Sequence, residues 1–398
     1  MNPAALRPGD RWIAGVLAGL LILTPLLGWV GALGFAPAVA LAGLLTLPWL
    51  QVRTADRALL LALFTALVWA CASVFWSPWR APDLEGQTGL KLVLMLTLYG
   101  AAISAARSVP EVRLAGLLRL LVAGATGLAL ILLAEAASGA AGYKAILGSL
   151  GQAVRPDQAV KNVAQGLYVL TLLAPLAVAA TTGWRRGLLA ILLLAGVAVP
   201  AHVFGYDAPI LALGLGAVAA GLVGAAPVLG PRILAAAVAA GFLVAPWLLA
   251  GVFRIGLGSQ LAGTLSESWR LRIGYWERSV DWIAARPLTG WGLEASRAFG
   301  PGIQLHPHNA ALQVWMELGL IGAVAAALVW ATVFSGLSRP RPGVAAASAS
   351  AAATAYLTFG AVSFGVWQGW WMALGALCAL VSILVLRARP IDLSGHSV

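Results

Sequence analysis

The sequence predicts an all-α polytopic membrane protein with about twelve transmembrane helices and both termini in the cytoplasm. Of its 398 residues, 61% are hydrophobic and only 10% are charged, whereas soluble chains carry about 25% charged residues. Apolar stretches that could cross a hydrocarbon core of about 30 Å as helices recur along the whole chain. The arginines between these stretches alternate in a way that favours one orientation.

Each apolar stretch is interpreted as one span. The first stretch runs on through Pro25 without a convincing cleavage site, so we expect a retained helix and not a signal peptide. With boundaries uncertain by several residues, the predicted spans are roughly 12–28, 31–50, 58–77, 90–106, 114–135, 163–181, 188–204, 208–228, 233–254, 309–335, 346–366 and 369–386.

Arginine placement gives the orientation. The inner loops of a chain with a cytoplasmic amino terminus all carry arginine, namely Arg53, Arg57, Arg107, Arg113, Arg185, Arg186, Arg232, Arg339, Arg341, Arg387 and Arg389. The shortest outer connections, 29–30, 205–207 and 367–368, carry no lysine or arginine, as the positive-inside rule requires. The net charge of +11 therefore reflects the membrane topology and does not indicate nucleic-acid binding. Two longer segments, 136–162 and 255–308, then face outward.

The first outer segment carries several cations near the start of the sixth span. Arg155 and Lys161 lie there, and Lys91 begins the fourth span near the same face. One interpretation is ordinary solvated charge with side chains snorkelling to water. The other is a cationic wall that binds an anionic lipid headgroup.

The second outer segment contains a predicted amphipathic helix. Its apolar residues recur at helical spacing, at Leu265, Trp269, Ile273, Trp276, Val280 and Ile283. Arg272 lies between two tryptophans on this face and leans toward the protein, whereas Arg278 falls on the opposite, solvated face. The alternative for Arg272 is a stem that packs on tryptophan with its head in water.

Two histidines precede the tenth span. We expect either His308 or Asn309 to cap that helix. A histidine at this boundary could accept a proton from a sugar hydroxyl, with nearby arginines stabilising a departing phosphate. The alternative is an interfacial histidine beside a capping asparagine. His306 and His308 are two residues apart, and the chain's other histidines are His202 and His396, so no metal site is expected.

Three sequences in this region resemble the O-antigen ligase and polymerase superfamily. They are R-x-x-x-W at 272–276, RPLTGWG at 286–292 and HNAALQVWMELGLIG at 308–322. The resemblance is carried by about fifty residues from 270 to 322, and the remaining spans agree in number and placement. It implies a GT-C-like fold and a metal-independent, inverting glycosyltransferase. Such an enzyme moves a glycan from undecaprenyl pyrophosphate to the lipid A-core oligosaccharide, at the periplasmic face of the bacterial inner membrane.

The resemblance also assigns roles. His308 would activate the acceptor hydroxyl as a base, and Arg272 would bind the pyrophosphate leaving group. Many members carry a serine–arginine pair after the seventh span, where this chain has Tyr206 and Asp207, so a second phosphate-binding cation must come from elsewhere. The further candidates for substrate binding are Arg155, Lys161, Lys91, Arg254, Asn309 and His306. The partners implied are the lipid-linked glycan, lipid A-core and membrane lipids, with no cofactor and no nucleic acid.

Other functions stay open. An O-antigen polymerase or a protein O-oligosaccharyltransferase shares the pattern and differs in its acceptor, and the compact outer segments favour the ligase. A transporter of lipid-linked glycan would show charge near the bilayer midplane or paired broken helices in two related halves. Neither is evident in the sequence. Glu317 follows His308 by nine residues, about 180° away around an ideal helix, and is interpreted as a structural hydrogen-bonding residue.

Overall fold

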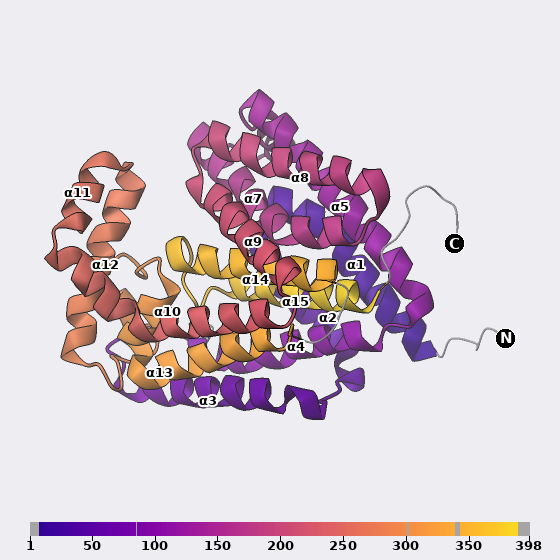
Figure 1. Ribbon diagram of the computed structural model, residues 1–398. Coiled ribbons are helices and arrows are strands. Elements are labelled where there is room, and N and C mark those ends of the chain that lie inside the picture. The colour runs from indigo at the N-terminus through magenta and orange to yellow at the C-terminus, as the bar shows by residue number, and fades with distance from the viewer. Residues whose placement is uncertain (1–7, 85, 301, 339–342, 389–398) are drawn as a thin grey trace.

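The chain is almost entirely helical over the part that the computed structural model describes, which is residues 8–84, 86–300, 302–338 and 343–388 (Figure 1). In these residues, twelve helical stretches are long and apolar enough to cross a membrane. This confirms the predicted all-α polytopic fold class. The long helices are α1 (Pro8–Val30), α2 (Phe35–Thr46), α3 (Arg57–Ser73), α4 (Thr88–Ser108), α5 (Glu111–Ser138), α7 (Pro156–Ala179), α8 (Gly183–Phe204), α9 (Asp207–Ala225), α10 (Leu229–Arg254), α13 (Ala310–Ser335), α14 (Gly343–Val362) and α15 (Gly369–Arg387).

Helix α7 lies at the centre of the bundle. In its most apolar stretch 78% of the residues are buried, against 17% for α10 at the periphery. Close packing depends on small residues, because a Cβ on Gly166 of α7 would lie 2.7 Å from the Gly28 carbonyl oxygen of α1. Helices in lipid associate through such close backbone approach, since the tails surrounding them are as apolar as their side chains. A residue on α7 is therefore well placed to line an internal site.

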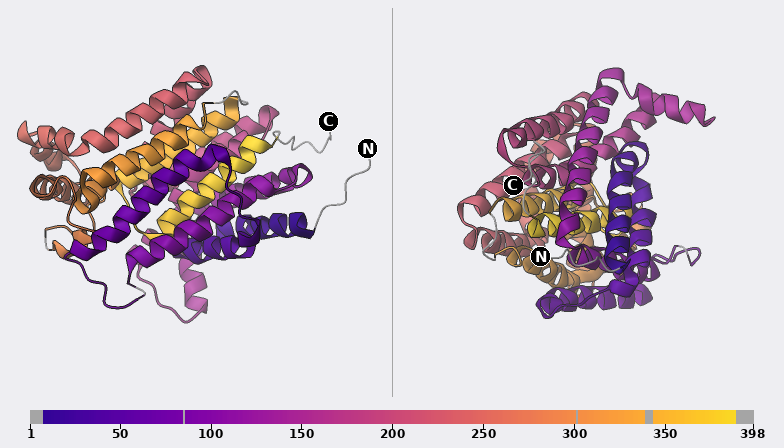
Figure 2. Two further views of the ribbon diagram at one scale, coloured as in Figure 1. Left: turned by 90° about the horizontal axis from the view of Figure 1, so that it is seen from below. Right: turned by 90° about the vertical axis from the view of Figure 1, so that its right-hand side faces the viewer.

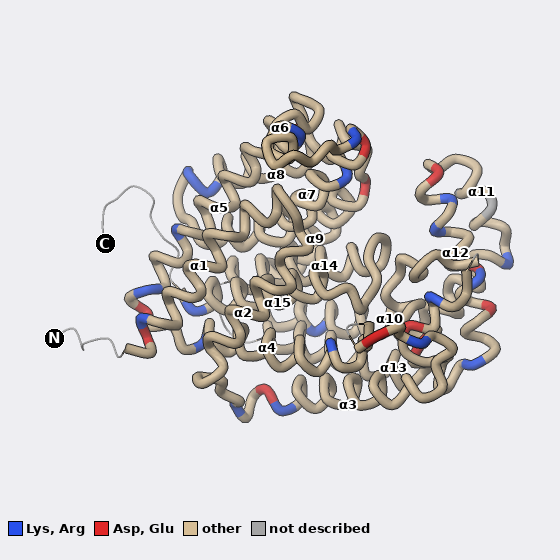
Figure 3. The backbone as a smooth tube through the Cα atoms, turned by 180° about the vertical axis from the view of Figure 1, so that it is seen from behind, with Lys and Arg blue, Asp and Glu red and all other residues tan. Residues whose placement is uncertain are grey.

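Several arginines predicted for the inner loops hold helix ends together. Arg107 at the end of α4 pairs with Asp56, and Arg387 at the end of α15 donates to the carbonyl oxygens of Ala106 and Val109 at 2.6 and 2.7 Å. Charged residues gather toward the ends of the bundle, with long uncharged stretches between them (Figure 3). Which side of the membrane each end faces stays a prediction. Arg339, Arg341, Arg389 and His396 lie outside the described residues.

The first predicted outer segment, 136–162, is mostly helix. Helix α5 continues to Ser138 and stops at Gly139, which adopts a left-handed φ of 64°. The short helix α6 (Ala141–Ser149) follows, and α7 begins at Pro156, a residue suited to the first helical position. The connection is thus shorter than the sequence predicted.

The second outer segment, 255–308, forms a cap at one end of the bundle. It contains α11 (Leu257–Thr264), α12 (Glu267–Ala285) and the 3₁₀ turn η5 (Ala295–Ala298). Figure 2 shows α11 and α12 grouped beyond the end of the long helices. The amphipathic helix predicted here is confirmed as α12, which packs against α10 and α13. Its inner face is thereby brought toward the start of α13.

Candidate active site

Helix α13 is broken at Gly319, where φ is 65° and ψ is −160°. The backbone groups released by this break bond to segment 287–292. Leu320 N donates to Pro287 O at 2.8 Å, Trp291 N to Met316 O at 2.8 Å and Gly292 N to Glu317 O at 2.7 Å. Glycine is required at the break, because a Cβ on Gly319 would lie 2.3 Å from the Leu288 carbonyl oxygen. The P-L-T-G-W-G and E-x-G sequences are therefore two halves of one backbone joint.

Glu317 is fully buried beside this joint. Its carboxylate oxygens have four donor groups within hydrogen-bond distance. These are Glu294 N at 2.7 Å, Ser296 Oγ at 2.7 Å, Gln313 Nε2 at 3.1 Å and Trp367 Nε1 at 2.6 Å. A buried carboxylate needs such partners, and these contacts confirm its predicted structural role. Glu317 ties α13 to segment 294–296 and to the loop 363–368, between α14 and α15.

Both histidines of the cluster contact the loop 363–368. The His308 Nδ1 atom lies 2.7 Å from the Ser363 carbonyl oxygen, and the His306 Nε2 atom lies 3.1 Å from Gln368 Nε2. The His308 backbone N–H donates to His306 Nδ1 at 3.1 Å. The two rings lie 4.1 Å apart between centroids. One loop therefore orients both imidazoles.

His306 is a neutral ring with both nitrogens engaged. Because Nδ1 accepts a backbone N–H, the neutral tautomer carries its hydrogen on Nε2, which faces Gln368. Exchanging the amide O and N of Gln368 gives that hydrogen an acceptor and places Gln368 Oε1, otherwise without a partner, in a hydrogen bond. Burial lowers the pKa of His306 to about 3, helped by His308 and Arg297. His306 as a substrate-binding residue stays a prediction.

His308 presents one nitrogen for chemistry. Its Nδ1 faces a carbonyl oxygen and must carry the hydrogen, so Nε2 is an unprotonated acceptor. No hydrogen bond to Nε2 is formed by the residues described. Burial lowers the pKa of His308 and Arg272 lowers it further, against the raising effect of the Ser363 carbonyl. Tyr275 of α12 stacks on the ring, 6.2 Å between centroids and 18° between planes.

The backbone at His308 is strained and held by its neighbours. Its φ is 55°, a left-handed value that is uncommon for residues other than glycine and is found at functional sites. Asn309 Oδ1 accepts from Leu312 N at 3.0 Å, which confirms a cap at this position and assigns it to the asparagine. Trp276 Nε1 donates to the Pro307 carbonyl oxygen at 2.9 Å.

Arg272 lies one helical turn before Tyr275 on α12 and is half-buried, in agreement with the prediction that it leans toward the protein. Burial lowers the pKa of Arg272, while Tyr168 and Asp207 raise it. The guanidinium carbon is 5.1 Å from the centroid of the Trp269 ring. Within the described residues Arg272 has no hydrogen-bond or ion-pair partner. A half-buried group with five N–H donors and no acceptor is suited to bind an anion.

The two cations predicted in the first outer segment differ in their surroundings. Arg155 pairs with Asp157 at 3.2 Å, and its side chain is 78% exposed. Lys161 is exposed on α7, two turns before Tyr168 and on the same face, a rise of about 10 Å. The position of Lys161 above Tyr168 makes it the better candidate of the two for a phosphate near Arg272.

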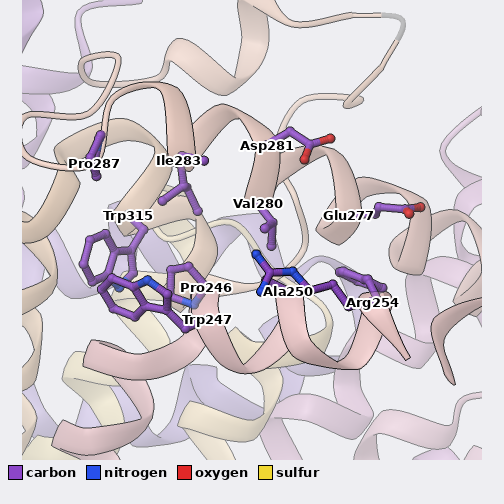
Figure 4. Close-up of a pocket in the computed structure, with 12 residues that line it drawn as sticks. Pro246, Trp247, Ala250, Arg254, Glu277, Val280, Asp281, Ile283, Pro287 and Trp315 are labelled. Carbon is purple, nitrogen blue, oxygen red and sulfur yellow. The ribbon is translucent and has the colours of Figure 1, made fainter. Parts of the chain in front are cut away.

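Lys91 and Arg254 line two separate cavities. Lys91 lines one of about 630 Å³, together with Trp79, Trp367 and Gln368, the last of which contacts His306. Arg254 lines one of about 500 Å³ between α10 and α12 (Figure 4). Of the two, only the cavity of Lys91 is lined by a residue, Gln368, that contacts the histidine cluster. No group of three or more His, Cys, Asp or Glu side chains in the described part of the chain is arranged to hold a metal ion.

Sequence reasoning missed three residues of this site. Tyr275 follows Arg272 by three positions, so extending the helical face by one residue would have found it. Tyr168 is a polar aromatic residue inside an apolar span, which is also a recognisable signal. Ser363 contributes only its carbonyl oxygen, and a backbone group carries no signal in the sequence.

The chain is similar in sequence to known proteins. The sequence model of a family described as "O-Antigen ligase" matches residues 169–327, a range that includes Arg272, His308 and Glu317. This confirms the predicted resemblance to the O-antigen ligase family. A "Putative polysaccharide ligase" of Rickettsia conorii is 27% identical over 136 residues, covering 30% of this chain and 33% of the relative. One of Rickettsia prowazekii is 29% identical over 137 residues, covering 30% and 34%. These matches span about a third of the relatives' length.

Proposed function

We propose that the protein is an O-antigen ligase of the bacterial inner membrane. It transfers a glycan from undecaprenyl pyrophosphate to the lipid A-core oligosaccharide at the periplasmic face. One observation carries the proposal: Arg272, a half-buried arginine without a described acceptor, lies one helical turn before Tyr275, whose ring stacks on His308, and no described residue bonds to His308 Nε2. An anion-binding group beside a base suits displacement of a phosphate leaving group by a hydroxyl. The family match supports the same reaction.

The proposed step is a single displacement. The acceptor hydroxyl oxygen attacks the anomeric carbon and transfers its proton to His308 Nε2. The bond from that carbon to the pyrophosphate oxygen breaks, and its electron pair stays on the pyrophosphate. Arg272 stabilises the negative charge that grows there, so its contribution is larger in the transition state than in the ground state. Attack from the face opposite the leaving group inverts the anomeric carbon.

The surroundings suggest where each substrate lies. The donor pyrophosphate is placed at Arg272, with Lys161 toward the exposed end of the same wall. The acceptor sugars are placed in the cavity of about 630 Å³ beside Gln368, where Trp79 and Trp367 offer apolar faces and Lys91 offers a cation. Aromatic walls with few polar groups are typical of ligand cavities. A single displacement requires the acceptor hydroxyl and the leaving group to lie on opposite faces of the anomeric carbon.

The pH dependence of transfer should report the ionisation of His308. Only the neutral imidazole accepts a proton, so kcat/KM should fall as the pH drops through the pKa of His308. Burial and Arg272 lower that pKa, so the midpoint should lie below the ordinary value of about 6.5. The check is kcat/KM of the reconstituted protein between about pH 5 and 8. A midpoint above 6.5 would contradict a buried neutral base.

Reconstitution tests the function directly. Purified protein in proteoliposomes is given undecaprenyl-pyrophosphate-linked glycan and lipid A-core, with and without a metal chelator. We expect glycan on lipid A-core and undecaprenyl pyrophosphate released in equal amounts, unaffected by the chelator. Lengthened donor would select the polymerase, glycan on an added protein acceptor would select the oligosaccharyltransferase, and translocation without a covalent product would select the transporter.

A further inference from the structure

The cavity of about 500 Å³ lies between α10, α12 and α13 and is bordered on α12 by Glu277, Val280 and Asp281 (Figure 4). Its wall is apolar along one side, with Trp247, Val280 and Trp315. The Trp247 and Trp315 rings meet edge to face, 5.1 Å between centroids. This wall is suited to a hydrocarbon chain or another apolar group.

Charges of both signs line the same cavity. Arg254 is the last residue of α10, and Glu277 and Asp281 lie one turn apart on α12. None of the three has a hydrogen bond or an ion pair with any residue that the structure describes. Opposite charges therefore line one cavity without forming an ion pair. A ligand that carries a cation and an anion a few ångströms apart would satisfy all three.

The cavity extends from the end of a span into its apolar part. Arg254 ends the apolar helix Leu229–Arg254, which places it at the depth of lipid headgroups. Trp247 lies seven residues earlier, about 10 Å deeper along the helix, and its side chain is 62% exposed on the surface of the bundle. Along the helix, the charged residues thus lie at the depth of a phospholipid headgroup, and the apolar wall lies at the depth of its acyl chains.

We propose that this cavity binds an aminophospholipid of the phosphatidylethanolamine type. The phosphate lies on Arg254, the primary ammonium lies between Glu277 and Asp281, and an acyl chain lies along Trp247. A phosphoglycerol headgroup has no cation for the two carboxylates. A choline headgroup has no N–H to donate to them. The site is separate from the proposed reaction, because neither Arg272 nor His308 is among the residues that line it.

Competition between two lipids tests the proposal. Purified, delipidated protein in detergent is given equal amounts of phosphatidylethanolamine and phosphatidylglycerol, and the bound lipids are counted by native mass spectrometry. Wild type should favour phosphatidylethanolamine on the order of fivefold, as expected for a few exposed charges. Glu277→Gln with Asp281→Asn should reverse the preference, because Arg254 then meets the anionic lipid alone. Arg254→Gln should lose most binding of both lipids.

A charge change on the same helix outside the cavity provides the control. Glu267→Gln with Arg270→Gln removes an exposed ion pair in the first turn of α12 and should leave the lipid ratio unchanged. Each variant must elute as a single species with a wild-type melting temperature. A lipid ratio that is the same in wild type and in both cavity variants would overturn the proposal, as would a wild type that favours phosphatidylglycerol. Either result can be obtained while the protein still transfers glycan.

Discussion

Replacing His308 with asparagine should lower the rate of glycan transfer by about 10²- to 10⁴-fold, the usual contribution of a general base. Asparagine tolerates the left-handed φ of 55° at this position. Its amide can donate to the Ser363 carbonyl, as His308 Nδ1 does at 2.7 Å. The substitution therefore preserves the local fold and removes only the basic nitrogen. The measurement is the transfer rate in proteoliposomes at saturating donor.

Alanine at the same position is a harsher test. His308→Ala should also abolish transfer, but alanine is strained at positive φ and leaves the Ser363 carbonyl without its partner. A drop seen with alanine alone could thus come from a displaced segment. His202→Asn, on α8, is the matched control and should transfer at the wild-type rate. If His308→Asn retains more than about a tenth of the wild-type rate, the histidine is not the base.

The fold could be predicted because its signals are local. Each span is a continuous apolar stretch of a length set by the bilayer. Helix α12 could be predicted because its apolar residues recur at helical spacing. Segment 136–162 was predicted less well, since the apolar run of α6 is too short to distinguish a helix from a loop. The inner-face position of Arg272 followed from the same periodicity as the helix itself.

The joint at Gly319 could not be predicted from such signals. The sequence shows E-x-G and P-L-T-G-W-G as separate glycine-containing segments. The two segments pair through the backbone, with Trp291 N donating to Met316 O. These residues are too far apart in the sequence for a local pattern to predict the contact. A single glycine inside a span is also ordinary in membrane helices. Only the structure shows that α13 is broken there and that Glu317 binds the loop 363–368.

The same limit applies to the cations. Arg155, Lys161, Lys91 and Arg254 were equal candidates for a second phosphate contact, because the sequence places all of them at the outer ends of spans. The structure separates them by cavity. Arg254 lines a cavity together with Glu277 and Asp281, whereas Lys91 lines the cavity next to Gln368. Which of these charges lie close together depends on the tertiary structure, so the sequence alone could not rank them.

Replacing Arg272 with methionine should lower kcat by about 10- to 100-fold, the loss expected for a charge-assisted contact of about 1.5–3 kcal/mol. Methionine keeps an apolar stem beside Trp269, where the guanidinium carbon now lies 5.1 Å from the ring centroid. It removes every N–H donor. If Arg272 only packs on tryptophan, this variant should be as active as wild type. The measurement is kcat and KM for the lipid-linked donor, taken separately.

Lysine at position 272 tests which property of the guanidinium matters. Arg272→Lys retains the positive charge but cannot make two parallel hydrogen bonds to one phosphate, so donor affinity should survive better than rate. A fall in kcat with little change in KM is expected, because the pyrophosphate gains charge only as the glycosyl bond breaks. Arg278→Lys serves as control, since Arg278 donates to the Gly302 carbonyl oxygen at 2.8 Å on another face of α12. Unchanged kinetics in both Arg272 variants would show that Arg272 does not stabilise the leaving group. Lys161 and Lys91 would then be the candidates for the cation that binds the pyrophosphate.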